Sequence, residues 1–194
     1  MAGEDALVLW ETAQTFLGVP DDDQLIVEHL IIAASLFANK YTSRKLAWRT
    51  YDGETDDEIY DGTGSRVLYL KQYPVTSITA IYEDTDRAWP STTEIDSDSY
   101  TYYPDRGKVV FDNILYLGAR TIKAEYIAGY VPADTPEDLA MAIFIIIDYW
   151  KKRIDDHGWG VTAVGVEDKR ISYQLGVPKQ AKEILNLYRK SVIR

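Results

Sequence analysis

The feature that most constrains this chain is a nearly all-apolar segment, residues 139–150, in which Asp148 is the single charged residue. The segment is too short to span a bilayer, which takes about 20 apolar residues. A helix that is apolar on every side must be covered on every side, either by the other helices of its own chain or in part by a second subunit. We therefore expect Ile143, Ile147 and Trp150 in the core, and part of the face formed by residues 141–145 exposed in a single copy.

The spacing of apolar residues changes twice along the chain. Helical spacing over residues 4–17 and 21–42 gives way to alternation between 48 and 131, and it returns over 135–155 and 178–191. The pattern predicts an α+β protein: a four-helix α-helical core, residues 1–47 and 132–194, with an inserted small antiparallel β-sheet domain, residues 48–131. Residues 157–176, within the second core segment, are Gly-rich and are expected to form a flexible arm.

The same spacing assigns faces to individual segments. In the first two helices the residues expected to face the core are Leu7, Trp10, Ala13 and Leu17, then Leu25, Ile26, Leu30, Ala33, Ala34, Phe37 and Tyr41. In the last helix they are Ala181, Ile184, Leu185, Tyr188 and Val192. In the β region, Ile78, Ala80 and Tyr82 should share a face, and Ile122, Ala124 and Tyr126 should lie opposite Lys123 and Glu125. Residues 100–103 and 108–111 should form a hairpin, within one sheet of about five or six strands.

Charge is distributed unevenly. The net charge of the chain is −10. Residues 1–61 hold 13 acidic and 4 basic side chains, whereas residues 132–194 hold 9 acidic and 10 basic side chains. A chain without a strong basic patch is not expected to grip nucleic acid through its phosphates. One acidic end and one nearly neutral end suit a protein that meets different partners at its two ends.

No constellation of residues indicates catalysis, a cofactor or a metal. The chain has no cysteine, and its two histidines, His29 and His157, lack the spacing of a metal site or a catalytic triad. The acidic run at residues 52–58 has Asp57 where a calcium loop needs glycine, so it reads as a solvated hairpin. Residues 21–23, all Asp, are expected to cap the second helix, with a metal site as the alternative. A carboxylate-based hydrolase stays open only because 31 acidic residues always offer pairs.

Four regions, taken in order, carry a resemblance over nearly the whole chain. They are LIVEHLIIAA at 25–34 with YTSRKL at 41–46, VLYLKQYPVTSI at 67–78, YIAGYVP at 126–132 before the apolar helix ending YWKKR at 149–153, and the Gly-rich arm with ILNLY at 184–188. Together they resemble the head–tail connector (adaptor, head-completion) proteins of tailed bacteriophages and prophages. The β insertion is larger than in the smallest, all-helical members of that family.

The resemblance implies a non-enzymatic structural protein of the virion, made in the bacterial cytoplasm. It implies a ring of about twelve subunits between the portal protein and the tail or a stopper protein, with genomic DNA passing through without sequence-specific binding. No membrane partner and no cofactor are expected. The alternative, from the 15 tyrosines and the predicted sheet, is a cytoplasmic β-rich module that binds peptide or glycan.

The arm is the segment for which we expect a direct role in partner binding. Its candidate residues are Trp159, Lys169, Arg170, Ile171 and Tyr173. A short β-like piece at residues 170–173 could add to a partner's surface by strand pairing, either the portal or the adjacent subunit. The simpler interpretation is that these residues form only a flexible connector.

Overall fold

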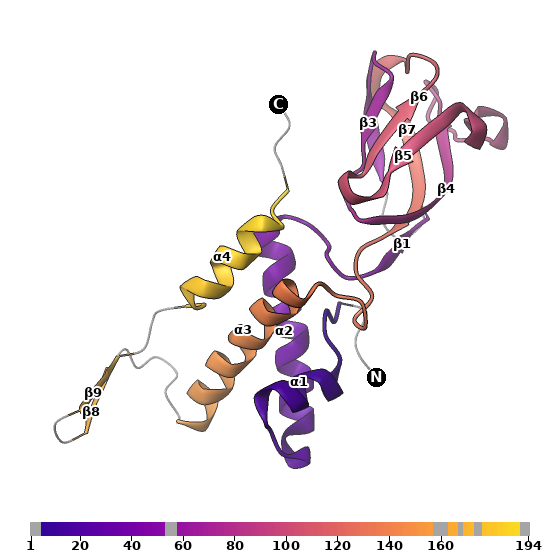
Figure 1. Cartoon of the computed structure of the whole chain (residues 1–194). Coiled ribbons are helices and arrows are strands. Elements are labelled where there is room, and N and C mark those ends of the chain that lie inside the picture. Colours follow the sequence, from indigo (N-terminus) through magenta and orange to yellow (C-terminus); the bar gives the residue numbers. More distant parts are fainter. Residues whose placement is uncertain (1–4, 53–57, 157–162, 167–168, 173–175, 191–194) are drawn as a thin grey trace. The chain divides into compact units, whose positions relative to one another are not determined.

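A computed structural model describes residues 5–52, 58–156, 163–166, 169–172 and 176–190 of the chain (Figure 1). The chain divides into two compact units: a helical unit, residues 1–44 and 131–194, and a β unit, residues 45–130. Helices and antiparallel sheets are both present, so the α+β class is confirmed. Within the described residues, no helix is both long enough and apolar enough to cross a membrane.

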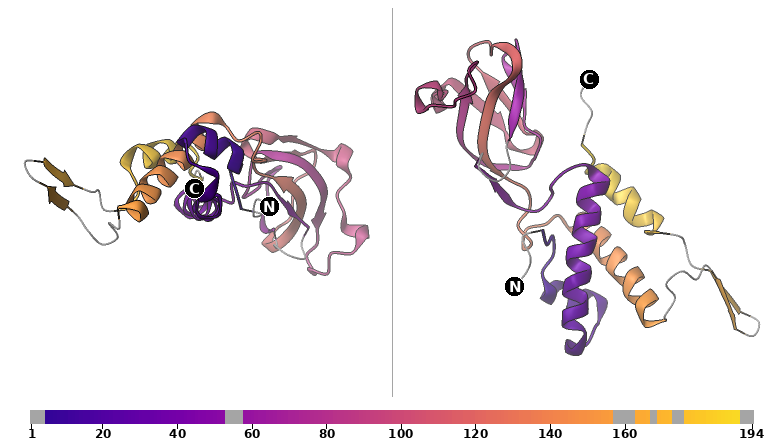
Figure 2. Two further views of the ribbon diagram at one scale, coloured as in Figure 1. Left: turned by 90° about the horizontal axis from the view of Figure 1, so that it is seen from below. Right: turned by 180° about the vertical axis from the view of Figure 1, so that it is seen from behind.

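The apolar segment forms the central helix of the helical unit. This helix, α3 (Glu137–Asp155), contacts α1 (Trp10–Leu17), α2 (Gln24–Thr42) and α4 (Lys179–Leu187), and Figure 2 shows it alongside α2. Ile143 and Ile147 are fully buried, as expected. Met141 is 38% exposed and Ile145 is partly exposed, so the chain covers most of the helix but leaves part of the 141–145 face open. Trp150 is only partly buried, against the expectation of a core position.

The first helix begins later than its sequence pattern indicated. Residues 5–9 are not helical, although Leu7 and Val8 are buried. The Leu7 backbone N–H donates to Ser35 Oγ at 3.1 Å, and its carbonyl accepts from Thr135 Oγ1 at 2.6 Å. Because these backbone groups bond to other elements, they are not available for helical hydrogen bonds. At the other end, Gly18 ends α1 in the left-handed conformation, at φ 64°.

The buried stripe of α2 differs from the predicted one. The residues that are buried are Val27, Leu30, Ile31, Ala34, Ser35, Ala38 and Thr42. Leu25, Ile26 and Ala33 are exposed, contrary to expectation, and Phe37 is partly buried. Apolar residues occur around most of this helix, so spacing alone could not select which stripe would meet α3.

The last helix is shorter than predicted. It ends at Leu187, with Tyr188 at its C-cap, and Val192 lies outside the described residues. Val177, Ala181 and Leu185 are buried, while Ile184 is partly exposed. Pro178 is the N-cap of α4. Proline is tolerated at a helix start because a backbone N–H at that position would have no acceptor within the helix.

The β unit contains two sheets where the sequence indicated one. A four-stranded sheet is built around the long strand β7 (Leu117–Ala128), which pairs with β1 (Arg49–Tyr51), β2 (Ile59–Thr63) and β4 (Val75–Glu83). A three-stranded sheet has the order β3 (Val67–Tyr69), β6 (Lys108–Phe111), β5 (Tyr100–Tyr103). The predicted hairpin is confirmed, since Tyr103 pairs with Lys108 and Gly107 takes a positive φ of 58° between them.

Register irregularities in β4 overturn part of the predicted alternation. The pairing of β4 with β7 shifts between Val75 and Ser77 and again between Ile78 and Ala80. A bulge changes which residues face inward, so Ala80 and Ile81 are both buried, while Ile78 and Tyr82 are only partly buried. Alternation in β7 follows the prediction: Ile122, Ala124 and Tyr126 are fully buried. Lys123 and Glu125 form an ion pair at 2.8 Å on the other face.

Candidate interaction surfaces

The outer side of α2 leaves large apolar side chains without cover inside the described part of the helical unit. Leu25 is 67% exposed, and Ile26 and Leu36 are also exposed. A cleft of about 380 Å³ lies beside them, lined by residues that include Val8, Trp10, Glu11, Glu28, His29 and Ile32. Leu25, Ile26, Leu36 and this cleft form what we call the α2 outer face. Exposed apolar surface of this kind is a candidate contact surface for another macromolecule.

The N-terminal end of the α2 outer face is strongly acidic. Residues 11–28 contain Glu11, Asp21, Asp22, Asp23 and Glu28, and no Lys or Arg. The three aspartates form a 3-10 turn that leads directly into α2, where the helix dipole favours negative charge. The side chain of Asp23, at the N-cap, makes no capping hydrogen bond and instead lies 3.0 Å from Lys151 Nζ. The predicted capping role is therefore electrostatic.

His29 also lies on the α2 outer face, where it is exposed rather than packed at the edge of the core. Its Nδ1 is 2.7 Å from the carbonyl oxygen of Leu25, one turn earlier. The other histidine, His157, lies outside the described residues. Among the residues that the structure describes, no cluster of three or more His, Asp or Glu side chains is arranged to hold a metal ion.

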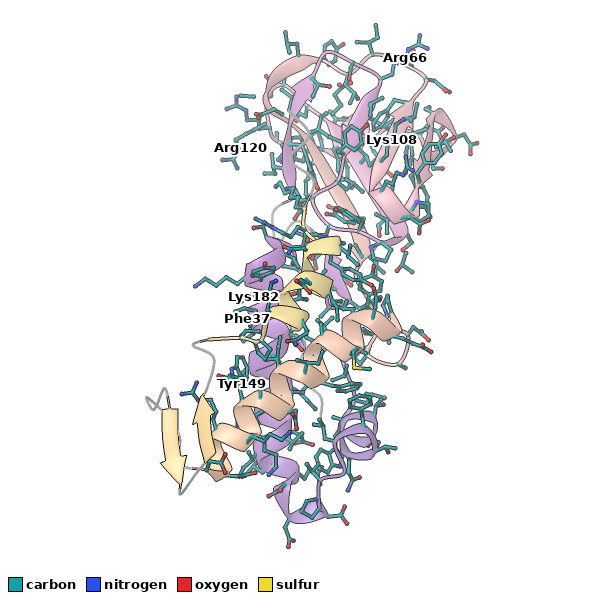
Figure 3. All side chains as sticks on the ribbon, turned by 60° about the vertical axis from the view of Figure 1, so that its left-hand side comes forward. Phe37, Arg66, Lys108, Arg120, Tyr149 and Lys182 are labelled. Carbon is teal, nitrogen blue, oxygen red and sulfur yellow. The ribbon has the colours of Figure 1, made fainter. Side chains whose placement is uncertain are left out.

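The segment formed by α4 and the three residues that follow it, residues 179–190, carries the opposite charge. Residues 179–190 contain Lys179, Lys182, Arg189 and Lys190 against the single acid Glu183. Leu187, in the same segment, is 77% exposed. These residues form what we call the α4 outer face, and Figure 3 marks Lys182 on it.

Hydrogen bonds from α2, from α3 and from Arg44, which follows α2, hold α4 in place. The Tyr188 hydroxyl donates to Asp138 Oδ1 at 2.5 Å, and Arg44 Nη1 donates to the Tyr188 carbonyl at 3.0 Å. The Tyr41 hydroxyl donates to Asn186 Oδ1 at 3.0 Å. These bonds fix α4 and Tyr188, the residue that follows it, against the rest of the helical unit.

A third apolar surface lies in the β unit. Ile114, Tyr116 and Leu117 are 64%, 63% and 83% exposed. The intervening Leu115 is buried, and its N–H donates to the Ser65 carbonyl at 3.0 Å, while the Tyr116 N–H donates to Glu83 Oε1 at 2.7 Å. We call residues 114–117 the apolar loop. The run Ile-Leu-Tyr-Leu was visible in the sequence, but it reads equally well as a buried strand.

A buried polar cluster connects the strands of the β unit. Tyr60 donates to Glu58 Oε2 at 2.6 Å and lies 3.3 Å from the Tyr126 hydroxyl, while the N–H groups of Lys71 and Gln72 donate to Tyr60 and Tyr126. Burial, followed by the nearby Tyr126 and Glu58, raises the pKa of Tyr60, and burial likewise raises the pKa of Tyr126. Glu58 is buried, which corrects the prediction of a fully solvated acidic hairpin at its position. The cluster holds β2, β7 and residues 71–72 together.

The predicted arm residues are only partly described. Trp159 and Tyr173 lie outside the described residues. Lys169, Arg170 and Ile171 lie in β9 (Lys169–Ser172), whose backbone pairs with β8 (Ala163–Val166) in an antiparallel two-stranded sheet. The β-like piece expected at residues 170–173 therefore coincides with a strand over 170–172. An isolated two-stranded sheet is at best marginally stable in water, so a partner strand or surface would stabilise it.

The chain is similar to a known protein family over most of its length. A family model described as "Head completion protein" matches residues 10–191, which includes both units. No curated protein matches the chain.

Three solved structures share the fold. A chain from the neck of an empty gene transfer agent particle, computed with C6 symmetry, has a TM-score of 0.59 at 15% identity, covering 97% of this chain and 92% of that chain. A chain from the virion of the native gene transfer agent particle has a TM-score of 0.59 at 14% sequence identity, again covering 97% of this chain and 92% of that chain. A chain from the native neck, computed with C12 symmetry, has 0.56 at 14%, covering 100% of this chain and 97% of that chain.

Proposed function

Because the chain belongs to the head completion protein family and has a structural role at the head–tail junction of a virion, we propose that it acts there as a ring-forming connector. In this proposal the ring lies between the portal protein and the tail or a stopper protein, and it catalyses no reaction. The observation that carries the proposal is the family match, because it extends through the helical unit and the β unit alike.

Two further observations support a ring. Two of the similar chains belong to particle necks computed with C6 and C12 symmetry. A closed cyclic ring needs two different surfaces on each subunit, since every copy contacts the next through a repeated heterologous interface. The helical unit presents two different exposed surfaces, the α2 outer face and the α4 outer face.

We propose that genomic DNA passes through the ring without sequence-specific binding. The net charge of −10 supports this, because phosphates are held by clustered Lys and Arg, which this chain lacks on the scale of a DNA-binding domain. A wall that repels the DNA backbone lets the duplex slide.

We also propose a separate role for each segment of the chain. The helical core, residues 1–47 and 132–194, would form the ring, and the β-rich insertion, residues 48–131, would offer its apolar loop to a neighbouring virion protein. The arm, residues 157–176, would contact the portal or the adjacent subunit through Trp159, Lys169, Arg170, Ile171 and Tyr173. The unshared edges of β8 and β9 support this, since strand addition satisfies backbone groups that an edge leaves open.

The test is to remove the protein from a phage that encodes it and then add it back. Without the protein, filled heads and free tails should accumulate separately, and the purified full chain should restore joined particles. Heads and tails that join normally without it would contradict the proposed connector.

A second experiment tests the role of the arm, residues 157–176. A variant with residues 161–172 replaced by a short Gly/Ser linker should fold but fail to join heads to tails. The control replaces residues 91–93, a 3-10 turn of the β unit, by a Gly/Ser segment of the same length as the residues removed. Normal joining by the arm variant would show that the arm is only a connector.

A further inference from the structure

The two outer faces of the helical unit carry opposite charge. Residues 11–28 have five acids and no base, and one of the acids, Asp23, is paired with Lys151 of α3 at 3.0 Å. Residues 179–190 have four bases and one acid, Glu183, which is paired with Lys179 at 3.4 Å. Each face also exposes a large apolar side chain near its charges, Leu25 on one and Leu187 on the other. An exposed apolar centre with a charged rim is the usual composition of a protein–protein interface.

The two faces cannot meet within one chain. The α4 helix is attached to the C-terminal end of α2, where the Lys190 N–H donates to the Thr42 carbonyl at 3.0 Å and Tyr41 bonds Asn186. The acidic residues lie at the N-terminal end of α2. The helical rise of about 1.5 Å per residue puts Leu25 and Thr42 about 25 Å apart along the helix axis. Figure 1 shows α1 and α4 toward opposite ends of α2.

Neither face can pair well with a copy of itself, because like charges would be brought together. We propose that the α2 outer face of one copy binds the α4 outer face of the next copy, with Leu25 near Leu187 and the acids of residues 11–28 opposite Lys179, Lys182 and Lys190. This inference rests on the proposed ring and names its subunit interface. A head-to-tail contact between two different faces is the kind that closes into a ring.

Charge exchange tests the contact with the full chain. The acid-reversed variant is Asp21→Lys/Asp22→Lys/Glu28→Lys, and the base-reversed variant is Lys179→Glu/Lys182→Glu/Lys190→Glu. Each variant alone should self-associate about tenfold more weakly than the wild type, since three rim pairs become repulsive. Mixed in equal amounts, the two should recover association to within about threefold of the wild type, because each variant then offers the other a complementary face. Sedimentation velocity over a range of protein concentrations measures the strength of self-association for each variant and for the mixture.

The control for net charge is Arg66→Glu/Arg106→Glu/Lys108→Glu in the β unit, which makes the same change in charge as the base-reversed variant. It should self-associate like the wild type. If the control weakens association as much as the base-reversed variant, or if the mixture does not recover, the proposed interface is wrong.

Cysteine cross-linking in purified particles gives a readout that does not need association of the free protein. The chain has no cysteine, so Leu25→Cys and Leu187→Cys introduce the only two thiols. A bismaleimide is preferred to direct oxidation, because a disulfide needs Cα atoms within about 7 Å. The double variant should give a ladder of covalent multimers, and the Leu117→Cys/Leu187→Cys control should give none.

The outcomes separate the interface from the function. A ladder with the double variant supports the interface. If particles carry the protein as a ring of normal mass but give no ladder, or if the single Leu25→Cys variant gives cross-linked dimers, the interface is overturned while the connector role stands. If the wild-type protein is absent from joined particles, the proposed function itself fails.

Discussion

The hydroxyl of Tyr60 lies 2.6 Å from Glu58 Oε2 and 3.3 Å from the hydroxyl of Tyr126, inside the β unit. Both tyrosines and the glutamate are buried, so each polar group depends on the others for its hydrogen bonds. The arrangement keeps both phenols protonated in the folded state, because the folded interior offers no favourable site for a phenolate beside a carboxylate.

Stability should therefore fall at alkaline pH. Burial raises the pKa of Tyr60 and of Tyr126 above the ordinary value of 10.0. Above that pH the unfolded chain loses protons that the folded chain keeps, so stability is fully present below pH 10 and is lost as the pH rises further. The loss should be about 1.4 kcal/mol per pH unit for each tyrosine, or about 2.7 for both. Urea unfolding at several alkaline pH values measures this slope. Tyr126→Phe should reduce this slope by about 1.4 kcal/mol per pH unit, and an unchanged slope would contradict the assignment.

Two residues of α3 should differ in their sensitivity to truncation. Trp150 is partly buried and meets Phe37 edge-on, with ring centroids 6.4 Å apart. Trp150→Ala should cost about 2 kcal/mol, below the roughly 3–5 kcal/mol of a fully buried tryptophan. Ile147 is fully buried, so Ile147→Ala should lower the free energy of unfolding by about 4 kcal/mol. Chemical denaturation compares them, and a larger loss for Trp150 would show that its ring is buried in solution.

Gly62 should be intolerant of any side chain. A Cβ added there would lie 1.8 Å from the Tyr116 carbonyl oxygen, a backbone atom that cannot turn away. Gly62→Ala should displace the apolar loop and destabilise the β unit by about 3 kcal/mol or more. The control is Gly64→Ala, whose Cβ would be in ordinary contact at 3.5 Å but whose φ is +66°, so it should cost only about 1 kcal/mol. Equal losses for the two variants would contradict the close approach.

Asp84 should control the order of the loop that follows β4. Its carboxylate accepts hydrogen bonds from the N–H groups of Asp86, Ala88 and Trp89 at 2.8–2.9 Å, and the bonds, that of Asp86 first, lower its pKa. Arg87 and Trp89 take positive φ values of 60° and 54°, which few side chains favour without such support. Asp84→Ala should speed hydrogen exchange at residues 86–89 and leave β7 unchanged. Asp84→Asn retains one acceptor oxygen and should be intermediate; unchanged exchange in Asp84→Ala would refute the role.

Local pattern was informative wherever one strong period dominated. Alternation in β7 predicted the inward faces of Ile122, Ala124 and Tyr126, and the apolar run in α3 predicted Ile143 and Ile147 as core residues. The Gly107 turn and its hairpin followed from turn chemistry. These are properties that neighbours along the chain impose on one another, so sequence suffices for them.

The remaining features depended on which surfaces meet in space. Local sequence pattern was enough to predict helices, strands and an apolar helix that must be buried against other elements. Packing in three dimensions selects which side of α2 is buried: Val27 and Ile31 are buried and Leu25 is exposed, although both sides of the helix are apolar. The bulges of β4, the non-helical backbone at Leu7 and the exposure of residues 114–117 were decided in the same way. In each case the free energy comes from contacts between residues far apart in the sequence, which local spacing does not encode.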